Sequence, residues 1–118
     1  MVETNGFVTQ REISSFNDEE RLHFYELFAH NLTVSIRGIW SDENISETEK
    51  LDRIRLVNEI LHKVTNKIWV LRLNTHKWTE EDFWQMMNEY TSDNESIRGE
   101  ILFAIKRSFI AVKNKNNQ

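Results

Sequence analysis

The chain has 118 residues, enough for one hydrophobic core but not for a core and a separate nucleotide-binding domain, and its 39% hydrophobic residues exclude a disordered protein. With three Gly, no Pro and no Cys, it lacks the turn residues typical of all-β proteins and has no means of forming disulfides or thiolate zinc sites. The net charge of -4 argues against general nucleic-acid binding, and no apolar run approaches the roughly 20 residues needed to span a bilayer.

The domain layout that we expect is all-α and follows the chain in three parts. Residues 1–15 form an N-terminal arm, extended or disordered, residues 16–113 form a single four-helix domain, and residues 114–118 form a disordered tail. The N-terminus lacks the basic start and apolar core of a signal peptide, so we expect a cytoplasmic protein without membrane contacts.

Helix starts are marked by pairs with the spacing of a capping box, in which a polar N-cap residue is followed three residues later by an acid. The pairs are Asn17 with Glu20, Ser46 with Glu49, Thr79 with Asp82, and Ser92 with Glu95. Each precedes a segment with helical apolar periodicity, which predicts helices over 18–39, 47–73, 80–90 and 93–113. Trp78 and Phe83 also have the spacing of a hydrophobic staple around the third start.

The apolar faces of these helices exceed what one small bundle buries. The helix over 18–39 carries two apolar stripes, and the helix over 93–113 is apolar on almost every side. Short connections favour antiparallel neighbours, so we expect an up-down four-helix bundle. We favour a homodimer formed through a second apolar face, with the candidate contacts Phe24, Val34, Phe103 and Ile110. In the alternative, the N-terminal segment covers this face through Phe7, Val8 and Ile13.

Positive charge is concentrated in residues 50–77, which contain seven basic and two acidic residues. This block suits an acidic protein partner or a phosphate backbone, so nucleic-acid binding is a third functional hypothesis. We favour the simpler interpretation that the block faces the acidic first helix or solvent.

His62 is predicted to be exposed, because it lies roughly 130 degrees around the helix from the apolar seam. The seam residues are Ile54, Val57, Leu61, Val64, Ile68 and Leu71. Glu59 and His62 form a Glu-x-x-His pair, but a di-iron site needs a second such pair directed into the core. His23, Glu26 and His30 share another helix face, and two imidazoles seven residues apart are too far apart to hold one ion. We expect no metal and no cofactor.

The run "EILHKVTN", from Glu59 to Asn66, resembles the phosphoacceptor-histidine box of one branch of bacterial sensor histidine kinases, in which Glu-Ile-x-His-Arg-Val-x-Asn is typical. The resemblance covers about ten residues. It implies that His62 accepts and passes on a phosphoryl group, with Glu59 and Asn66 as supporting neighbours, on a long helix of a dimeric bundle. No glycine-rich ATP-binding segment follows, so it implies a phosphotransfer module supplied by another protein.

An aromatic and methionine-rich set near the third helix favours a core over a ligand pocket. Its members are Trp69, Trp78, Phe83, Trp84, Met86, Met87 and Tyr90. We therefore predict a small, non-catalytic helical module that binds a protein partner, with His62 as an ordinary surface histidine. Phosphotransfer through His62 is the alternative function.

Overall fold

The computed structural model describes residues 10–73 and 78–116. In chain order its elements are α1 (Gln10–Ser14), α2 (Asp18–Ser41), α3 (Glu47–Leu73), α4 (Glu80–Asp93), the 3₁₀ turn η1 (Glu95–Ile97) and α5 (Arg98–Asn116). No strand occurs in the described ranges, and the all-α class is confirmed.

The first two long helices begin where the polar N-cap residues predict. The Asn17 side chain accepts a hydrogen bond from the Glu20 amide at 2.8 Å, and the Glu20 carboxylate accepts one from the Asn17 amide at 2.9 Å. Before α3, the Ser46 hydroxyl accepts a hydrogen bond from the Glu49 amide at 3.1 Å. These bonds satisfy amides that have no partner within the helix, which is why the starts of α2 and α3 are encoded locally.

The start of α4 combines a capping box with a hydrophobic staple. Thr79 and Asp82 exchange the two capping hydrogen bonds. The rings of Trp78 and Phe83 meet edge to face, with centroids 5.7 Å apart. Both predicted features of this helix start are confirmed.

The fourth predicted helix start is wrong, because Ser92 lies inside α4. α4 instead ends at Asp93, where Asn94 leaves the helical conformation and its side-chain amide donates to the Tyr90 carbonyl at 3.0 Å. The chain then turns through η1, whose Ile97 is fully buried, before α5 begins. The break between α4 and α5 therefore lies later in the chain than the local pattern predicts. At this break Ile97 is buried in a tertiary contact.

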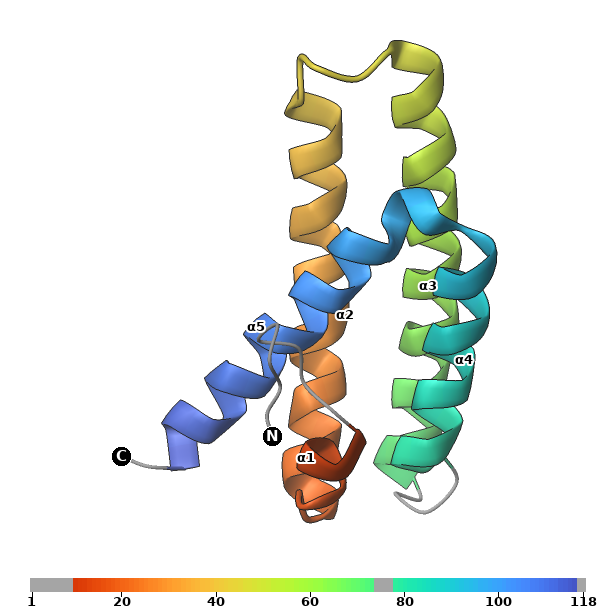
Figure 1. Cartoon of the computed structure of the whole chain (residues 1–118). Helices are drawn as coiled ribbons and strands as arrows, with labels where there is room; N and C mark the ends of the chain where they lie inside the picture. The colour runs from red at the N-terminus through yellow and green to blue at the C-terminus, as the bar shows by residue number, and fades with distance from the viewer. Residues whose placement is uncertain (1–9, 74–77, 117–118) are drawn as a thin grey trace.

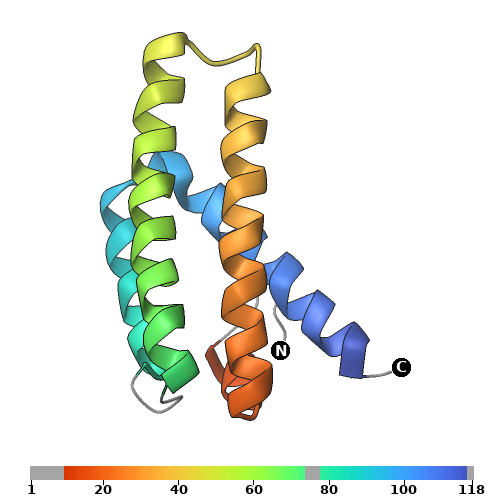
Figure 2. The same cartoon turned by 180° about the vertical axis from the view of Figure 1, so that it is seen from behind.

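The helices are arranged in two layers (Figures 1 and 2). α2 and α3 form a long antiparallel pair, and α4 runs back along α3. α5 crosses α2 obliquely, on the same side of the α2–α3 pair as α4. This crossing differs from the near-parallel packing of an up-down bundle, so the bundle topology is not confirmed.

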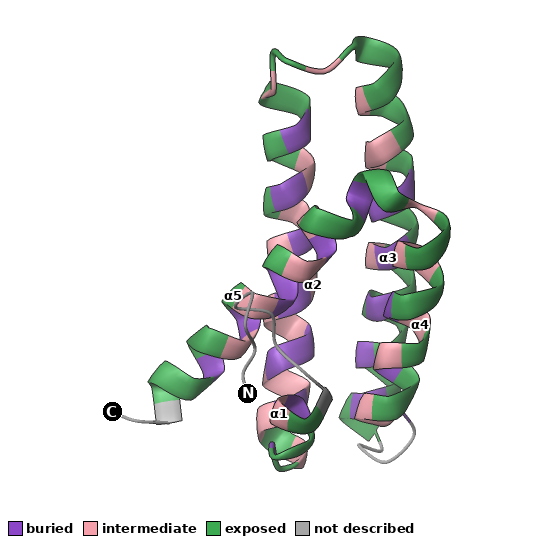
Figure 3. Cartoon of the chain, viewed as in Figure 1, coloured by how far each residue is buried: buried purple, intermediate pink, exposed green. Residues whose placement is uncertain are grey.

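Phe83 is at the centre of an aromatic core that joins α4 to α2. Its ring centroid lies 5.1 to 5.8 Å from those of Phe24, Tyr25, Phe28, Trp78 and Trp84. In Figure 3 the buried positions of α3 lie along the side turned toward α2. Trp78, Phe83 and Met87 are buried, which confirms the core interpretation for them, whereas Trp69 is 63% exposed.

Both chain ends require corrections within the described residues. Residues 10–14 form α1, with Ile13 fully buried, where an extended or disordered arm was predicted. The Phe16 ring lies 5.9 Å from Phe24 and 5.4 Å from Phe109, so the turn after α1 also joins the core. Phe7 and Val8 lie outside the described residues. α5 continues to Asn116, so the disordered tail predicted from residue 114 is wrong for 114–116.

Among residues 10–73 and 78–116, no helix combines the length and hydropathy needed to cross a bilayer.

Candidate functional site

His62, Glu59 and Asn66 lie one turn apart on the exposed side of α3. The opposite side of this helix is buried and consists of Leu56, Val57, Ile60, Val64, Ile68 and Leu71. The predicted exposure of His62 is therefore confirmed. Ile54 and Leu61 of the predicted seam are only half-buried, because Ile60 takes the central position between Val57 and Val64.

Glu59 has two neighbours other than His62. Its carboxylate accepts a hydrogen bond from Arg55 at 2.8 Å, and the Tyr90 hydroxyl of α4 lies 3.5 Å from its second oxygen. Arg55 also donates to Asp52 at 3.0 Å, and the hydrogen bond to Asp52 is the main cause of the raised pKa of Arg55. Glu59 thus contributes to the contact between α3 and α4.

Lys63, the residue after His62, completes this contact. Its ammonium lies 4.9 Å from the centroid of the Tyr90 ring, a favourable cation–π arrangement. The interaction with Tyr90, and to a smaller extent the charges of Glu59 and Glu89, raise the pKa of Lys63 above its ordinary value. Two hollows of about 200 and 430 Å³ flank Lys63 between α3 and α4. The outer side of α3 therefore meets an acidic helix beside His62.

The arginines of the basic block are paired with carboxylates. Arg53 pairs with Glu49 one turn earlier in α3, and Arg72 donates to Glu26 of α2 at 2.8 Å. The Arg72–Glu26 pair agrees with the interpretation that the block faces the acidic first helix. Nucleic-acid binding through α3 stays a prediction, with less uncompensated charge available to it than the sequence alone indicates.

The ion pair with Arg72 engages Glu26, which is one of the three residues of the predicted polar face with His23 and His30. Within the part of the chain that the structure describes, no three His, Asp or Glu side chains are arranged to hold a metal ion.

The structure separates the four predicted interface residues. Phe24 is fully buried, so its assignment to an exposed interface is wrong: its ring packs 5.6 Å from Phe83 in the core. Val34 is 39%, Phe103 55% and Ile110 44% exposed. These three residues remain available for a contact with another molecule.

Phe103 and Ile110 lie two turns apart on the outer side of α5 and are accompanied by basic residues. By helical spacing this side comprises Phe103, Lys106, Arg107, Ile110 and Lys113, which we call the α5 surface. The Arg107 guanidinium lies 5.6 Å from the Phe103 ring centroid. Among the ion pairs of the described residues, none involves a basic residue of α5.

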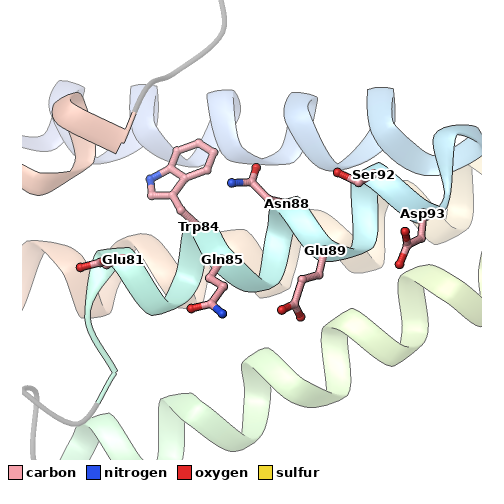
Figure 4. A pocket seen from close by; sticks show the side chains of 7 residues that line it. All are labelled: Glu81, Trp84, Gln85, Asn88, Glu89, Ser92 and Asp93. Carbon is pink, nitrogen blue, oxygen red and sulfur yellow. The ribbon is translucent and has the colours of Figure 1, made fainter.

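Sequence analysis missed a hollow on α4. It has a volume of about 580 Å³ and is lined by Glu81, Trp84, Gln85, Asn88, Glu89, Ser92 and Asp93. In Figure 4 the Trp84 and Asn88 side chains extend to one side of α4, and those of Gln85 and Glu89 to the other. The sequence feature that could have indicated this hollow is the acidic composition of α4, because residues 80–93 contain five acidic residues and no basic residue.

The missed exposed apolar residues are Trp40, Leu51, Trp69, Val70 and Leu73. Trp40 and Leu51 lie where α2 ends and α3 begins, and the other three lie at the end of α3. Exposed apolar residues are common on protein surfaces, so most of these positions stand out only once the helices are placed.

Comparison with family models, curated proteins and solved structures finds no match to this chain.

Proposed function

We propose that the chain is a non-catalytic protein-interaction module whose contact region is the α5 surface. The observation that supports this proposal is the exposure of Phe103 and Ile110 on a helix whose basic residues have no ion-pair partner among the described residues. Exposed aromatic and arginine side chains are the types that contribute most to protein interfaces. The partner is a protein, and homodimerisation is the form of this contact that we favour.

Site-specific photo-crosslinking in the native host tests this function. A photoreactive phenylalanine analogue placed at Phe103 should give a discrete protein adduct, and Ile110→Asp should abolish it. Leu51 is a matched control position, because its exposure of 54% is close to the 55% of Phe103 while it lies on another helix. Equal adducts from both positions would contradict the proposal.

A second candidate is phosphotransfer through His62. The observation in its favour is that His62 and Asn66 are exposed on a long helix, where a donor protein has access to the imidazole. The engagement of Glu59 with Arg55 and Tyr90 reduces its availability as a supporting neighbour.

Phosphorylation by phosphoramidate tests the second candidate. The phosphoryl group would pass to an imidazole nitrogen of His62 with release of ammonia, and intact-mass measurement would detect an acid-labile phosphohistidine. His62→Ala should abolish the product, whereas His30→Ala, at another exposed histidine, should not. Equal labelling of both variants would exclude a specific role for His62.

A further inference from the structure

We propose that the partner of the α5 surface is a second copy of this chain, and that the surface docks on the acidic outer side of α4 of that copy. This inference rests on the proposed interaction function and names its partner. It follows from the opposite charges of two helices, from the lack of an ion pair at any basic residue of α5 among the described residues, and from the placement of the two helices.

α5 is a strongly basic helix in an acidic protein. Residues 98–116 contain five basic residues and one acidic residue, although the whole chain has a net charge of -4. Arg107 and Lys113 lie over phenylalanine rings, 5.6 Å from the centroid of Phe103 and 5.9 Å from that of Phe109, and the ion pairs among the described residues include neither. Their charge is therefore available to a carboxylate from outside the chain.

α4 is the complementary helix. Two of its acids already have roles, because Glu80 pairs with Arg21 and Asp82 caps the helix. The exposed Glu81, Glu89 and Asp93 line the hollow on α4, and Glu89 also lies beside Lys63 of α3. Trp84 lines the same hollow (Figure 4). In the proposed dimer it supplies an aromatic contact for Phe103 of the other copy. The helix thus offers carboxylates and an aromatic residue along one hollow, whereas the α5 surface offers basic groups and an aromatic residue.

The placement of α4 and α5 separates their opposite charges within one chain, and no ion pair among the described residues joins the two helices. The two helices diverge from η1, and both lie on the same side of the α2–α3 pair (Figures 1 and 2). A two-fold axis passing between them sets the α5 surface of each copy on α4 of the other. Such an interface contains two identical contacts and closes on itself, which yields a dimer and not a fibre.

Exchange of charge between copies tests the proposal. Arg107→Glu should oppose the carboxylates of α4, and Glu81→Lys, at an exposed position of the α4 hollow, should oppose the basic residues of α5. Each variant alone should dimerise at least about tenfold more weakly than wild type in sedimentation equilibrium at low salt. An equimolar mixture of the two variants should recover the dimer, because one contact then has both charges reversed and the other has both native charges.

Matched controls are Arg37→Glu and Glu43→Lys, two reversals at exposed positions outside both surfaces. They should leave the dimer unchanged, and circular dichroism should show native helix content in every variant. Added salt should weaken the wild-type dimer.

Three results would overturn the inference: a wild-type protein that is monomeric at about 100 μM, where a dimer with a Kd of about 10 μM is mostly assembled, single variants that dimerise like wild type, or a mixture that stays monomeric. If the dimer fails while the analogue at Phe103 still gives an adduct with another protein, the interaction function stands and only the second copy is excluded. If both fail, both proposals fall.

Discussion

Asn31 of α2 donates a hydrogen bond to the Ser108 hydroxyl of α5 at 2.9 Å, across 77 residues of sequence. Ser108 is fully buried and donates in turn to the Ala104 carbonyl at 2.7 Å. The two small residues of α5, one turn apart, leave room for close approach to α2. This polar contact fixes the position at which the two helices pack in an otherwise apolar layer.

A double-mutant cycle should show that Asn31 and Ser108 are coupled. We expect Asn31→Ala and Ser108→Ala to have a coupling energy of about 1 kcal/mol in urea unfolding, because each truncation removes the same partly buried hydrogen bond. Thr91 donates to the Met87 carbonyl within α4, so Asn31→Ala and Thr91→Ala should be additive. Strict additivity of Asn31 and Ser108 would contradict the contact.

Arg21 links the start of α2 to the start of α4 through its ion pair with Glu80. We expect this ion pair to stabilise the fold. Arg21 is 9% exposed, and its guanidinium donates to Glu80 at 2.9 Å, with Asp18 as a second partner. Glu80→Gln should lower the free energy of unfolding by about 1–2 kcal/mol, because it removes one counter-charge from a buried cation. Glu81→Gln, an exposed neighbour, should change it by less than about 0.5 kcal/mol. Equal effects would refute the role of the ion pair.

Tyr25 should make stability decline in alkaline solution. Burial raises its pKa well above the ordinary value of 10.0, with Arg21 opposing the shift and Glu80 and Asp82 adding to it. The unfolded chain loses this proton near pH 10 while the folded chain retains it, so the contribution is complete below pH 10 and falls as the pH rises further. Tyr25→Phe should flatten this decline in thermal melts, and Tyr90→Phe should preserve it.

At neutral pH, Tyr25→Phe should leave the free energy of unfolding almost unchanged. The Tyr25 hydroxyl is buried without a hydrogen-bond partner among the described residues. Its removal should therefore change the free energy of unfolding by less than about 0.5 kcal/mol or stabilise the fold. A loss of several kcal/mol would indicate that the hydroxyl has a strong partner.

Two residues predicted as N-caps, Thr79 of α4 and Ser92 of the following helix, should respond differently to truncation. Thr79→Ala should cost about 1 kcal/mol, since it removes the acceptor for the Asp82 amide. Ser92→Ala should be nearly neutral or slightly stabilising, because Ser92 is inside α4 and alanine favours helix. Chemical denaturation of the two variants distinguishes these effects. A larger loss of unfolding free energy for Ser92→Ala than for Thr79→Ala would show that Ser92 acts as an N-cap.

Local chemistry allowed the sequence to predict three of the long helices closely. α3 occupies the predicted range 47–73, and α2 and α4 begin at the predicted residues. Each start depends on a side chain and an amide three residues apart, so no distant contact is needed. The boundary between α4 and α5 was misplaced because the Ser92 pattern is present but the helix continues past it to the Asn94 break.

Helical periodicity could not predict burial or contacts that depend on residues distant in the sequence. Phe24 belongs to an apolar stripe, but a stripe does not reveal whether its partner is the same chain or another; here the partner is Phe83. The burial of Ile13 agrees with the alternative in which the N-terminal segment covers an apolar face, whereas the short helix α1 that carries it was not predicted. The exposure of His62 was predictable because it depends only on position around one helix, whereas the contact of Glu59 with Tyr90 required the placement of α4.

The short connection at residues 42–46 predicts the order in which the helices pack during folding. Closing it has a small entropic cost, so the α2–α3 pair forms early, whereas the α5 contact at Ser108 must close a much longer loop. In stopped-flow experiments, Val57→Ala, at a buried position of α3, should slow folding. Ser108→Ala should mainly speed unfolding, because we expect α5 to dock after the transition state.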